Sequence, residues 1–376
     1  ASYGPLAIGP AGWIWRWKDR IDRRFMAGFA PSEAMAGGGA AGVEPMACRG
    51  CAAKLAAAPL ASALTRLNAS ASPAEDAVLV GRDADGGLLL QSVDGFPALL
   101  DDPWLNARLT TLHACSDLWA SGADVRSVQA LVTLPEAAPR LQEEWLLQTL
   151  AGVRSVLDPI GAALVGGHTL EGRDGAGLSL ALTVNGSAPA QRHWPKGPLE
   201  PGLALLLSRP IGSGVLFAAA MAGAARPGWI DAALAVMQGD QSALVALLAR
   251  HGTRACTDIT GFGLLGHLGE MLGPGVAVEL DPAAIPAHVG ALELLEQGFA
   301  STLAPSNAAA LALLEPSGPV RLAGEASAAS LQLLIDPQTC GPLLAALPDA
   351  AVPEALAALR SSGFPQAAVI GRVQAC

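Results

Sequence analysis

From about residue 45 onwards, strand-like and helix-like patterns of apolar residues alternate along the chain. Short apolar runs between Gly, Asp and Pro predict strands, and longer segments with apolar positions three and four apart predict helices. The predicted strands are Ala77–Val80, Leu88–Val93, Val125–Leu134, Ala162–Val165, Leu178–Val184, Leu203–Leu207, one near Ala255, Val276–Leu280 and Ala367–Ile370. The main predicted helices are Ala52–Leu67, Trp104–Ser121, Leu141–Leu157, Leu264–Leu272 and Pro353–Leu359. This mixture predicts an α+β fold.

A polar, Pro-rich break at Ser187–Pro201 predicts two α+β domains, residues 46–188 and 189–376. Residues 1–45 differ from the rest. Trp13, Trp15 and Trp17 precede a basic amphipathic stretch that ends at Met26, and a Gly-rich linker follows. A helix over residues 13–26 can lie on a membrane surface or pack on a neighbouring domain, and both interpretations stay open. The first residue is Ala1, which suggests a fragment or a processed product.

Composition narrows the class of protein. The 376 residues carry 23 Lys+Arg against 33 Asp+Glu, a formal net charge of −10, and 51% are hydrophobic. That hydrophobic content excludes general disorder, and the acidic balance argues against a nucleic-acid binder. The sequence contains no stretch of 18 uninterrupted apolar residues, so it predicts no membrane span. Six cysteines are too sparse for a disulfide scaffold and no secretory signal opens the chain, so we expect a cytoplasmic protein.

Neither of the two common phosphate-binding sequence patterns supports a nucleotide site in this chain. The pattern GxxxxGK[ST] is absent, whereas GxGxxG occurs at Gly261–Gly266. The segment before it, Arg254–Thr260, is too polar for a buried parallel strand, and Asp258 would place a carboxylate beside a pyrophosphate. The pattern therefore favours a Gly-rich turn that lets another backbone approach closely, rather than a dinucleotide site.

The sequence Cys48-Arg49-Gly50-Cys51-Ala52-Ala53-Lys54 is a second candidate for chemistry. A zinc site would need two further ligands, and no second CxxC or paired His supplies them. In a helix Lys54 lies one turn after Cys51, where its ammonium can favour the thiolate and also contact a phosphate. The alternative is a buried Cys beside a solvated Lys. Only three of the 23 basic residues are lysines, which favours a specific role for Lys54.

Four aspartates lie at the ends of predicted strands, in a predicted helix of otherwise small and apolar residues, or just before the Gly-rich turn: Asp76, Asp94, Asp117 and Asp258. For each alone a cap or turn role is commoner than ligation. Together they predict a carboxylate site for Mg²⁺ and ATP, because Mg²⁺ prefers carboxylate, phosphate and water oxygens. Gly166-Gly167-His168-Thr169, directly after the strand Ala162–Val165, predicts a backbone hairpin that can approach a nucleotide. His168 is either part of that site or a structural donor.

Taken together, these motifs resemble a known family. The motifs Cys51–Lys54, Glu75–Ala77, Val93–Asp94, Asp101–Pro103, Cys115–Asp117, Leu164–Thr169, Asp258–His267 and Asp336–Thr339 occur in the order and spacing of selenide, water dikinase (selenophosphate synthetase). The resemblance covers about residues 46–376. Residues 1–45 resemble the tail of an NADH dehydrogenase-like flavoprotein. The whole is therefore similar to fused oxidoreductase/selenophosphate synthetase proteins, with most of the flavoprotein half absent from this chain.

The resemblance implies a two-domain aminoimidazole ribonucleotide synthetase-like fold whose N-terminal domain dimerises through its sheet, with the nucleotide in a cleft beside that interface. It also implies the conversion of ATP, selenide and water to selenophosphate, AMP and phosphate. Carried over by position, the catalytic pair is Cys51 and Lys54. The Mg²⁺ ligands are Asp76, Asp117 and Asp258, and the residues at ATP-contacting positions are Lys54, Glu75, Asp94, Asp117, Gly166, Gly167 and His168.

The sequence also departs from the family pattern. Ala53 stands where a second Cys is common, Ala74 stands where an Arg is frequent, and Pro342 replaces a Gly that follows the Asp336–Thr339 motif. These changes remove supporting contacts but keep the proposed ligands. Two other functions remain open: a sibling ATP-dependent enzyme of the same fold that acts on a carbon-containing substrate, and a non-catalytic nucleotide-binding module.

Overall fold

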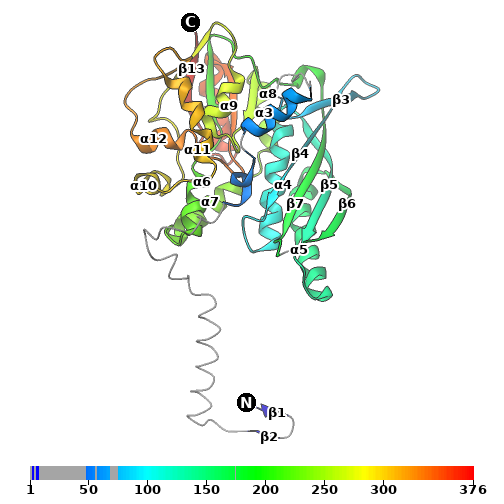
Figure 1. Ribbon diagram of the computed structural model, residues 1–376. Helices are drawn as coiled ribbons and strands as arrows, with labels where there is room; N and C mark the ends of the chain where they lie inside the picture. The colour runs from blue at the N-terminus through cyan, green and yellow to red at the C-terminus, as the bar shows by residue number, and fades with distance from the viewer. Residues whose placement is uncertain (1, 4–5, 8–47, 56, 68–74, 174) are drawn as a thin grey trace. The chain divides into compact units, whose positions relative to one another are not determined.

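The computed structural model describes residues 2–3, 6–7, 48–55, 57–67, 75–173 and 175–376, without the side chains of residues 2, 3, 6, 7, 51, 57, 58 and 61 (Figure 1). Ser2–Tyr3 (β1) and Leu6–Ala7 (β2) form a short antiparallel ladder. Residues 47–376 cluster as one compact unit, and 1–46 as another. The Trp-rich segment 13–26 and the predicted Gly-rich linker lie outside the described residues.

A five-stranded sheet forms the core of the N-terminal half. Its strands run in the order β3-β4-β7-β5-β6, antiparallel except for the β5–β6 pair. Along β4, β5 and β7 buried residues alternate with more exposed ones, so that one face of the sheet is covered and the other is not. The strands are β3 (Val78–Arg82), β4 (Leu88–Pro97), β5 (Asp124–Leu134), β6 (Ala163–Glu171) and β7 (Ser179–Ala188).

Two long helices, α4 (Pro103–Ala120) and α5 (Pro139–Leu157), cover one face of this sheet (Figure 1). Helix α4 begins where Asp102 accepts a hydrogen bond from the Leu105 backbone N–H and Pro103 takes the first helical position. Most of α4 is buried on every side because it also contacts the C-terminal half. Short elements precede the sheet: a 3₁₀ helix at Gly50–Ala53 and α3 (Ala57–Arg66).

The C-terminal half is built on a six-stranded mixed sheet of order β11-β10-β13-β8-β12-β9. Its strands are β8 (Leu203–Leu207), β9 (Ala255–Asp258), β10 (Val276–Leu280), β11 (Val320–Leu322), β12 (Leu343–Pro348) and β13 (Ala368–Ala375). Its helices are α6 (Ser213–Met221), α7 (Pro227–Met237), α8 (Ser242–Arg250), α9 (Gly263–Met271), α10 (Ala291–Glu296), α11 (Ala304–Asn307), α12 (Ala328–Leu333) and α13 (Val352–Ser361). Further 3₁₀ turns are Asp158–Ile160, Ala190–Arg192, Ala308–Leu314 and Asp349–Ala351.

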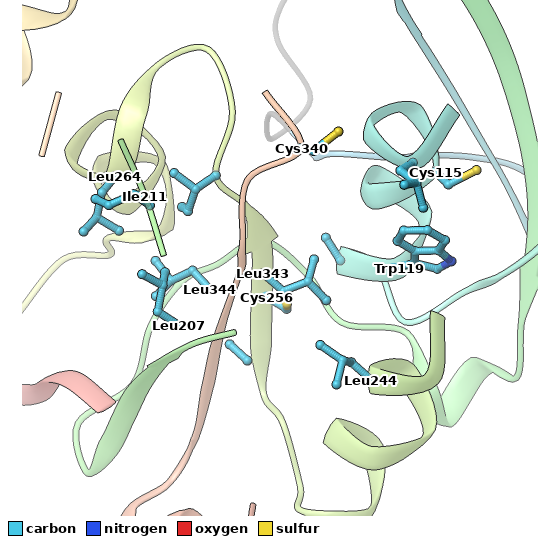
Figure 2. Close-up of a cluster of buried hydrophobic side chains, with 14 of the residues drawn as sticks. Cys115, Trp119, Leu207, Ile211, Leu244, Cys256, Leu264, Cys340, Leu343 and Leu344 are labelled. Atoms are coloured by element: carbon cyan, nitrogen blue, oxygen red, sulfur yellow. The ribbon is translucent and has the colours of Figure 1, made fainter. Parts of the chain in front are cut away.

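The interior is continuous between the two halves. Figure 2 shows Cys115 and Trp119 of α4 beside Leu343 of β12 and Leu244 of α8, within one cluster of buried apolar side chains. The two sheets therefore share α4 as a common layer. The two sheets and the helices that cover them confirm the predicted α+β fold.

Several predicted elements differ from the structure. The predicted helix Ala52–Leu67 is divided into the 3₁₀ helix and α3. The polar segment around Ala255 does contain a fully buried strand, β9, but it pairs antiparallel with β12. Among the described helices, no single one combines the length and apolar character of a membrane span; α7 and α8, bent by 60° at their junction, meet that criterion only as a pair.

The predicted hairpin at Gly166 and Gly167 is wrong. Both glycines lie inside β6, which continues to Glu171, and they pair with Gln129 and Ala130 of β5. A Cβ atom at Gly167 would collide with the carbonyl oxygen of Ala130. Glycine at this position therefore permits close strand packing rather than a turn.

Candidate active site

Three carboxylates from distant parts of the chain meet in the structure. Asp76 lies just before β3, Asp117 projects from α4, and Asp258 ends β9. One carboxylate oxygen from each lies within 4.8 Å of the other two. The predicted group of Asp76, Asp117 and Asp258 is thus brought together by the packing of α4 between the two halves.

Neighbouring hydroxyl groups hold these carboxylates. Thr257 Oγ1 donates to Asp76 Oδ1 at 3.2 Å, and Ser116 Oγ donates to Asp258 Oδ2. Each donor precedes another member of the group in the sequence, Thr257 before Asp258 and Ser116 before Asp117. The three aspartates are therefore linked by side chains as well as by proximity.

The electrostatics of the group favour a bound cation. Burial raises the pKa of Asp76 to about 7, with Lys196 opposing and Asp258 adding to the rise. Burial and the nearby Asp258 and Asp76 also raise the pKa of Asp117 well above its usual range. Like charges this close repel one another, and a divalent ion would relieve the repulsion. The donor set consists of hard carboxylate oxygens, which is the set that suits Mg²⁺.

Asp94 lies beside this group on β4 and is held by a buried histidine. His113 Nε2 of α4 is 3.1 Å from Asp94 Oδ2, and His113 Nδ1 accepts a hydrogen bond from the Cys340 backbone N–H at 3.1 Å. The second contact assigns the proton to Nε2, which therefore donates to Asp94. Burial opposes ionisation of Asp94, but His113, Lys54 and the Gly95 backbone N–H outweigh it and lower the pKa to about 2.

Lys54 is exposed and close to the same site. Its Nζ lies 5.0 Å from the ring centroid of Phe262, which immediately precedes α9, and its charge contributes to the low pKa of Asp94. Cys51 lies three residues earlier in the 3₁₀ helix. Lys54 can therefore reach a ligand between Asp94 and Phe262.

The 3₁₀ helix that carries Cys51 is anchored to both halves of the molecule. The Cys48 backbone N–H donates to Thr302 Oγ1 at 3.2 Å, and the Thr302 backbone N–H donates to Cys48 Sγ at 3.3 Å. At Gly50, whose φ is 64°, a Cβ would lie 2.9 Å from Thr339 Oγ1 and 3.2 Å from Leu99 Cδ1. Glycine is needed here both for its φ and for this close packing.

Lys196 was missed by the sequence analysis. Its Nζ lies 2.6 Å from Asp76 Oδ1 and 2.8 Å from Glu270 Oε2, and its backbone N–H donates to Glu75 Oε2 at 2.9 Å. Glu75, expected to contact ATP, thus holds the main chain of residue 196 in this structure. The rarity of lysine in the chain was the one sequence signal that pointed to Lys196.

Comparison with known proteins places the chain. Residues 74–188 match the N-terminal domain of AIR synthase related proteins, and residues 200–376 match the C-terminal domain. The selenide, water dikinase of Pelobacter propionicus is 32% identical over 333 residues, which cover 86% of this chain and 92% of the relative. That of Myxococcus xanthus is 33% identical over 338 residues, covering 87% and 93%. The chain belongs to the selenide, water dikinase family.

Solved structures show the same fold. A HypE–HypF complex aligns with a TM-score of 0.62 at 15% identity, covering 84% of this chain and 93% of that chain. AaThiL complexed with AMPPCP and TMP aligns with a TM-score of 0.58 at 15% identity, covering 86% and 92%. The chain thus has the two-domain AIR synthase-like fold that the resemblance implied.

Within this family member, the expected nucleotide loop is separated from Asp94. Gly166 and His168 lie on the outer face of the five-stranded sheet, away from α4. The cross-strand pairing places them in two neighbouring rows across β4, β7, β5 and β6: Val93, Thr183, Gln129 and Gly166 in one, and Gly95, Ala181, Leu131 and His168 in the other. Asp94 points to the inner face, where His113 contacts it. Asp94 therefore lies on the opposite face of the sheet from the predicted ATP-contacting residues Gly166 and His168.

The GxGxxG segment has a packing role. Gly263 opens α9 with a φ of 71°, and a Cβ there would lie 2.7 Å from the carbonyl carbon of Ile335. The Asn307 side-chain amide also donates to the carbonyls of Gly261 and Ile335 at 2.9 and 3.0 Å. The structure confirms a Gly-rich turn approached closely by another backbone segment.

Proposed function

We propose that this chain makes selenophosphate from selenide, ATP and water, and releases AMP and phosphate. The observation that carries the proposal is the meeting of Asp76, Asp117 and Asp258 within 4.8 Å, in a member of the selenide, water dikinase family. In this reaction the bond between the γ-phosphorus of ATP and its bridging oxygen breaks, and a bond from selenium to that phosphorus forms. Water then cleaves the remaining ADP to AMP and phosphate.

The three aspartates would hold Mg²⁺. When bound, Mg²⁺ supplies charge neutralisation and orientation of the ATP phosphates. Lys54, on a flexible side chain beside Asp94, is suited to follow the phosphoryl group as it moves. His113 holds Asp94 ionised and in a fixed rotamer, so that Asp94 presents a constant charge and position to the ligand.

Cys51 would guide or hold selenium rather than attack phosphorus. Hydroselenide is a strong nucleophile at neutral pH, so the transfer requires no dedicated general base. The anchors at Cys48 and Gly50 position the 3₁₀ helix that carries Cys51 next to Lys54. A role in delivery is consistent with a segment fixed by its main chain.

The outer face of the N-terminal sheet is proposed as a homodimer interface. It exposes apolar side chains on adjacent strands, and such patches mark association surfaces. A cavity of about 290 Å³ lies on this face and is lined by Val93, Leu131 and His168 among others. A second copy on this face would enclose Gly166, Gly167 and His168 in a cleft between the two copies. The exposed apolar residues are Val78, Leu89, Val93, Leu131 and Leu170.

Three broader expectations remain proposals. The chain divides into domains at residues 46–188 and 189–376, it functions in the cytoplasm, and residues 1–45 derive from a flavoprotein oxidoreductase that lies upstream. Limited proteolysis would test the domain boundary near residue 189. A pull-down with this chain as bait, in which captured flavoprotein is detected by its flavin absorbance, would test the third expectation.

Phosphorus NMR of the chain with ATP, Mg²⁺ and selenide tests the proposed reaction, because it separates selenophosphate from phosphate. We expect selenophosphate and AMP in equal amounts, strongly reduced in Cys51→Ala and Lys54→Ala. Matched controls are Cys376→Ala, at an exposed cysteine, and Arg250→Ala, at an exposed cation of α8. Formation of ADP without AMP, or AMP without selenophosphate, would contradict the proposal.

A further inference from the structure

Lys196 is a buried cation at the edge of the carboxylate group. Its side chain is 8% exposed, and its ammonium lies between Asp76 and Glu270. Glu270 Oε2 is also 3.2 Å from His267 Nδ1, and His267 Nε2 is 3.1 Å from Thr260 Oγ1. A continuous chain of polar contacts therefore runs from Asp76 through Lys196 into α9.

The main chain on both sides of Lys196 is fixed. The Cys256 backbone N–H of β9 donates to the Pro195 carbonyl at 3.2 Å, and the Leu199 backbone N–H donates to the Met271 carbonyl at 2.9 Å. A Cβ at Gly197 would lie 2.6 Å from the same Met271 oxygen. The segment is thus held against β9, which carries Asp258, and against the end of α9.

We propose that Lys196 is a positioning residue that holds Asp76 at a set distance from Asp117 and Asp258 before a divalent ion binds. Asp76 lies two residues before β3 and belongs to the N-terminal half. The contacts at Lys196 and Thr257 connect it to the C-terminal half, which also supplies Asp258. Lys196 therefore sets the spacing between ligands from the two halves.

A lysine suits this position better than an arginine. The ammonium is a compact charge with three donors, and it fits between Asp76 and Glu270 at 2.6 and 2.8 Å. A planar guanidinium is wider and would displace Asp76. This accounts for a lysine in a chain in which 20 of the 23 basic residues are arginines.

The inference rests on the proposed function only in that the three aspartates bind a divalent ion, and it needs neither selenide nor ATP. Its test is therefore direct Mn²⁺ binding to the full chain, measured by electron paramagnetic resonance without nucleotide. Partners that orient metal ligands change affinity by about 10- to 100-fold when removed. We expect Lys196→Gln to weaken Mn²⁺ binding by about that factor and Lys196→Arg to restore it only in part.

A second measurement separates positioning from stability. In Lys196→Gln the Mg²⁺ concentration for half-maximal AMP formation should rise by a similar factor, while the rate at saturating Mg²⁺ falls much less. The matched control is Arg372→Gln, which removes a cation from the exposed pair with Asp349 and should leave both values unchanged. Glu270→Gln keeps the Lys196–Asp76 contact and should weaken Mn²⁺ binding by a smaller factor. If Lys196→Gln does not fold, the Mn²⁺ affinity of Glu270→Gln tests the positioning role.

The outcomes are distinct. Unchanged Mn²⁺ affinity in both Lys196→Gln and Glu270→Gln, full recovery in Lys196→Arg, or tighter binding in Lys196→Gln would each overturn the inference. The last result would mean that Lys196 competes with the ion. Absence of Mn²⁺ binding by the native chain would overturn it too. If the affinities shift as expected but no variant and no native chain forms AMP, the positioning role stands and the proposed function fails.

Discussion

The two faces of the five-stranded sheet have opposite surroundings, although they are made from alternate residues of the same strands. On β4, Asp94 points to the inner face, where His113 of α4 fixes it. Its neighbour Val93 points to the outer face and is 68% exposed. The inner face is covered by helices and packs mostly apolar side chains, with Asp94 as its charged position. The outer face is open and exposes apolar side chains beside polar ones.

This difference shows how one strand can serve two tasks. Because the side-chain period of a strand is two, adjacent residues face different environments and can carry unrelated functions. The predicted ATP-contacting residues divide in this way, with Asp94 inside and His168 outside. The three predictions below test the two faces separately.

The largest expected effect belongs to the inner side. Asp117→Asn removes a charge from the three-carboxylate group, and we expect AMP formation to fall on the order of 100-fold or more. A coupled assay for AMP at fixed Mg²⁺ would measure it. Asp158→Asn, in an exposed pair with Arg154, is the matched control and should retain native activity. Native rates in Asp117→Asn would refute the assignment.

The outer face should respond through association. Leu131→Asp places a charge on the apolar surface, and we expect the dissociation constant of the homodimer to rise about 100-fold, since an unpaired charge buried at an interface costs several kcal/mol. Size-exclusion chromatography with light scattering would show a shift from dimer to monomer. Leu147→Asp, on the exposed side of α5, is the control. A native chain that is already monomeric would disprove the interface.

The smallest expected effect is the pH dependence of stability from Asp94. Its pKa is lowered from 3.8 to about 2, so the ionised form is stabilised in the folded state by about 2 kcal/mol. This contribution is complete above about pH 4 and is lost as the pH falls through about 2. The free energy of unfolding should therefore differ between native chain and Asp94→Asn at pH 6, and the difference should narrow by pH 3.

Denaturant titrations at several pH values would measure this difference. Asp349→Asn removes an exposed carboxylate paired with Arg372 and should differ from the native chain by less than about 1 kcal/mol at every pH. A gap for Asp94→Asn that stays constant with pH would mean that His113 does not hold an ionised carboxylate. That result would leave the two faces electrostatically alike.

Much of the fold could be predicted from local patterns. The helix expected at Trp104–Ser121 is α4 at Pro103–Ala120, and the strand expected at Leu203–Leu207 has those bounds. Strand β12 was missed because Leu343–Leu347 consists only of Leu and Ala, which have high helix propensity, and its complete burial leaves no alternation that would mark a strand. The Gly166–Gly167 hairpin was wrong because pairing with β5 outweighs the low strand propensity of glycine.

The candidate site was predictable in part. The positions of carboxylates along the chain pointed to four aspartates, the family resemblance selected Asp76, Asp117 and Asp258 among them, and the structure brings these three together. Lys196 lies in the polar, Pro-rich break between the two predicted domains, and only the packing of that stretch against β9 and α9 places its ammonium beside Asp76. Contacts of this kind depend on tertiary structure, which no local pattern encodes.

The sharing of α4 between the two sheets has a consequence for how the protein folds. A helix buried on all sides cannot keep its apolar surface covered if either half unfolds alone, so the two halves should unfold in a single cooperative transition. Because Asp117 belongs to this helix and its two partner carboxylates come from opposite halves, the ligand set is complete only when both halves are folded. Ligand binding at the site would therefore report directly on the folded fraction of the whole unit.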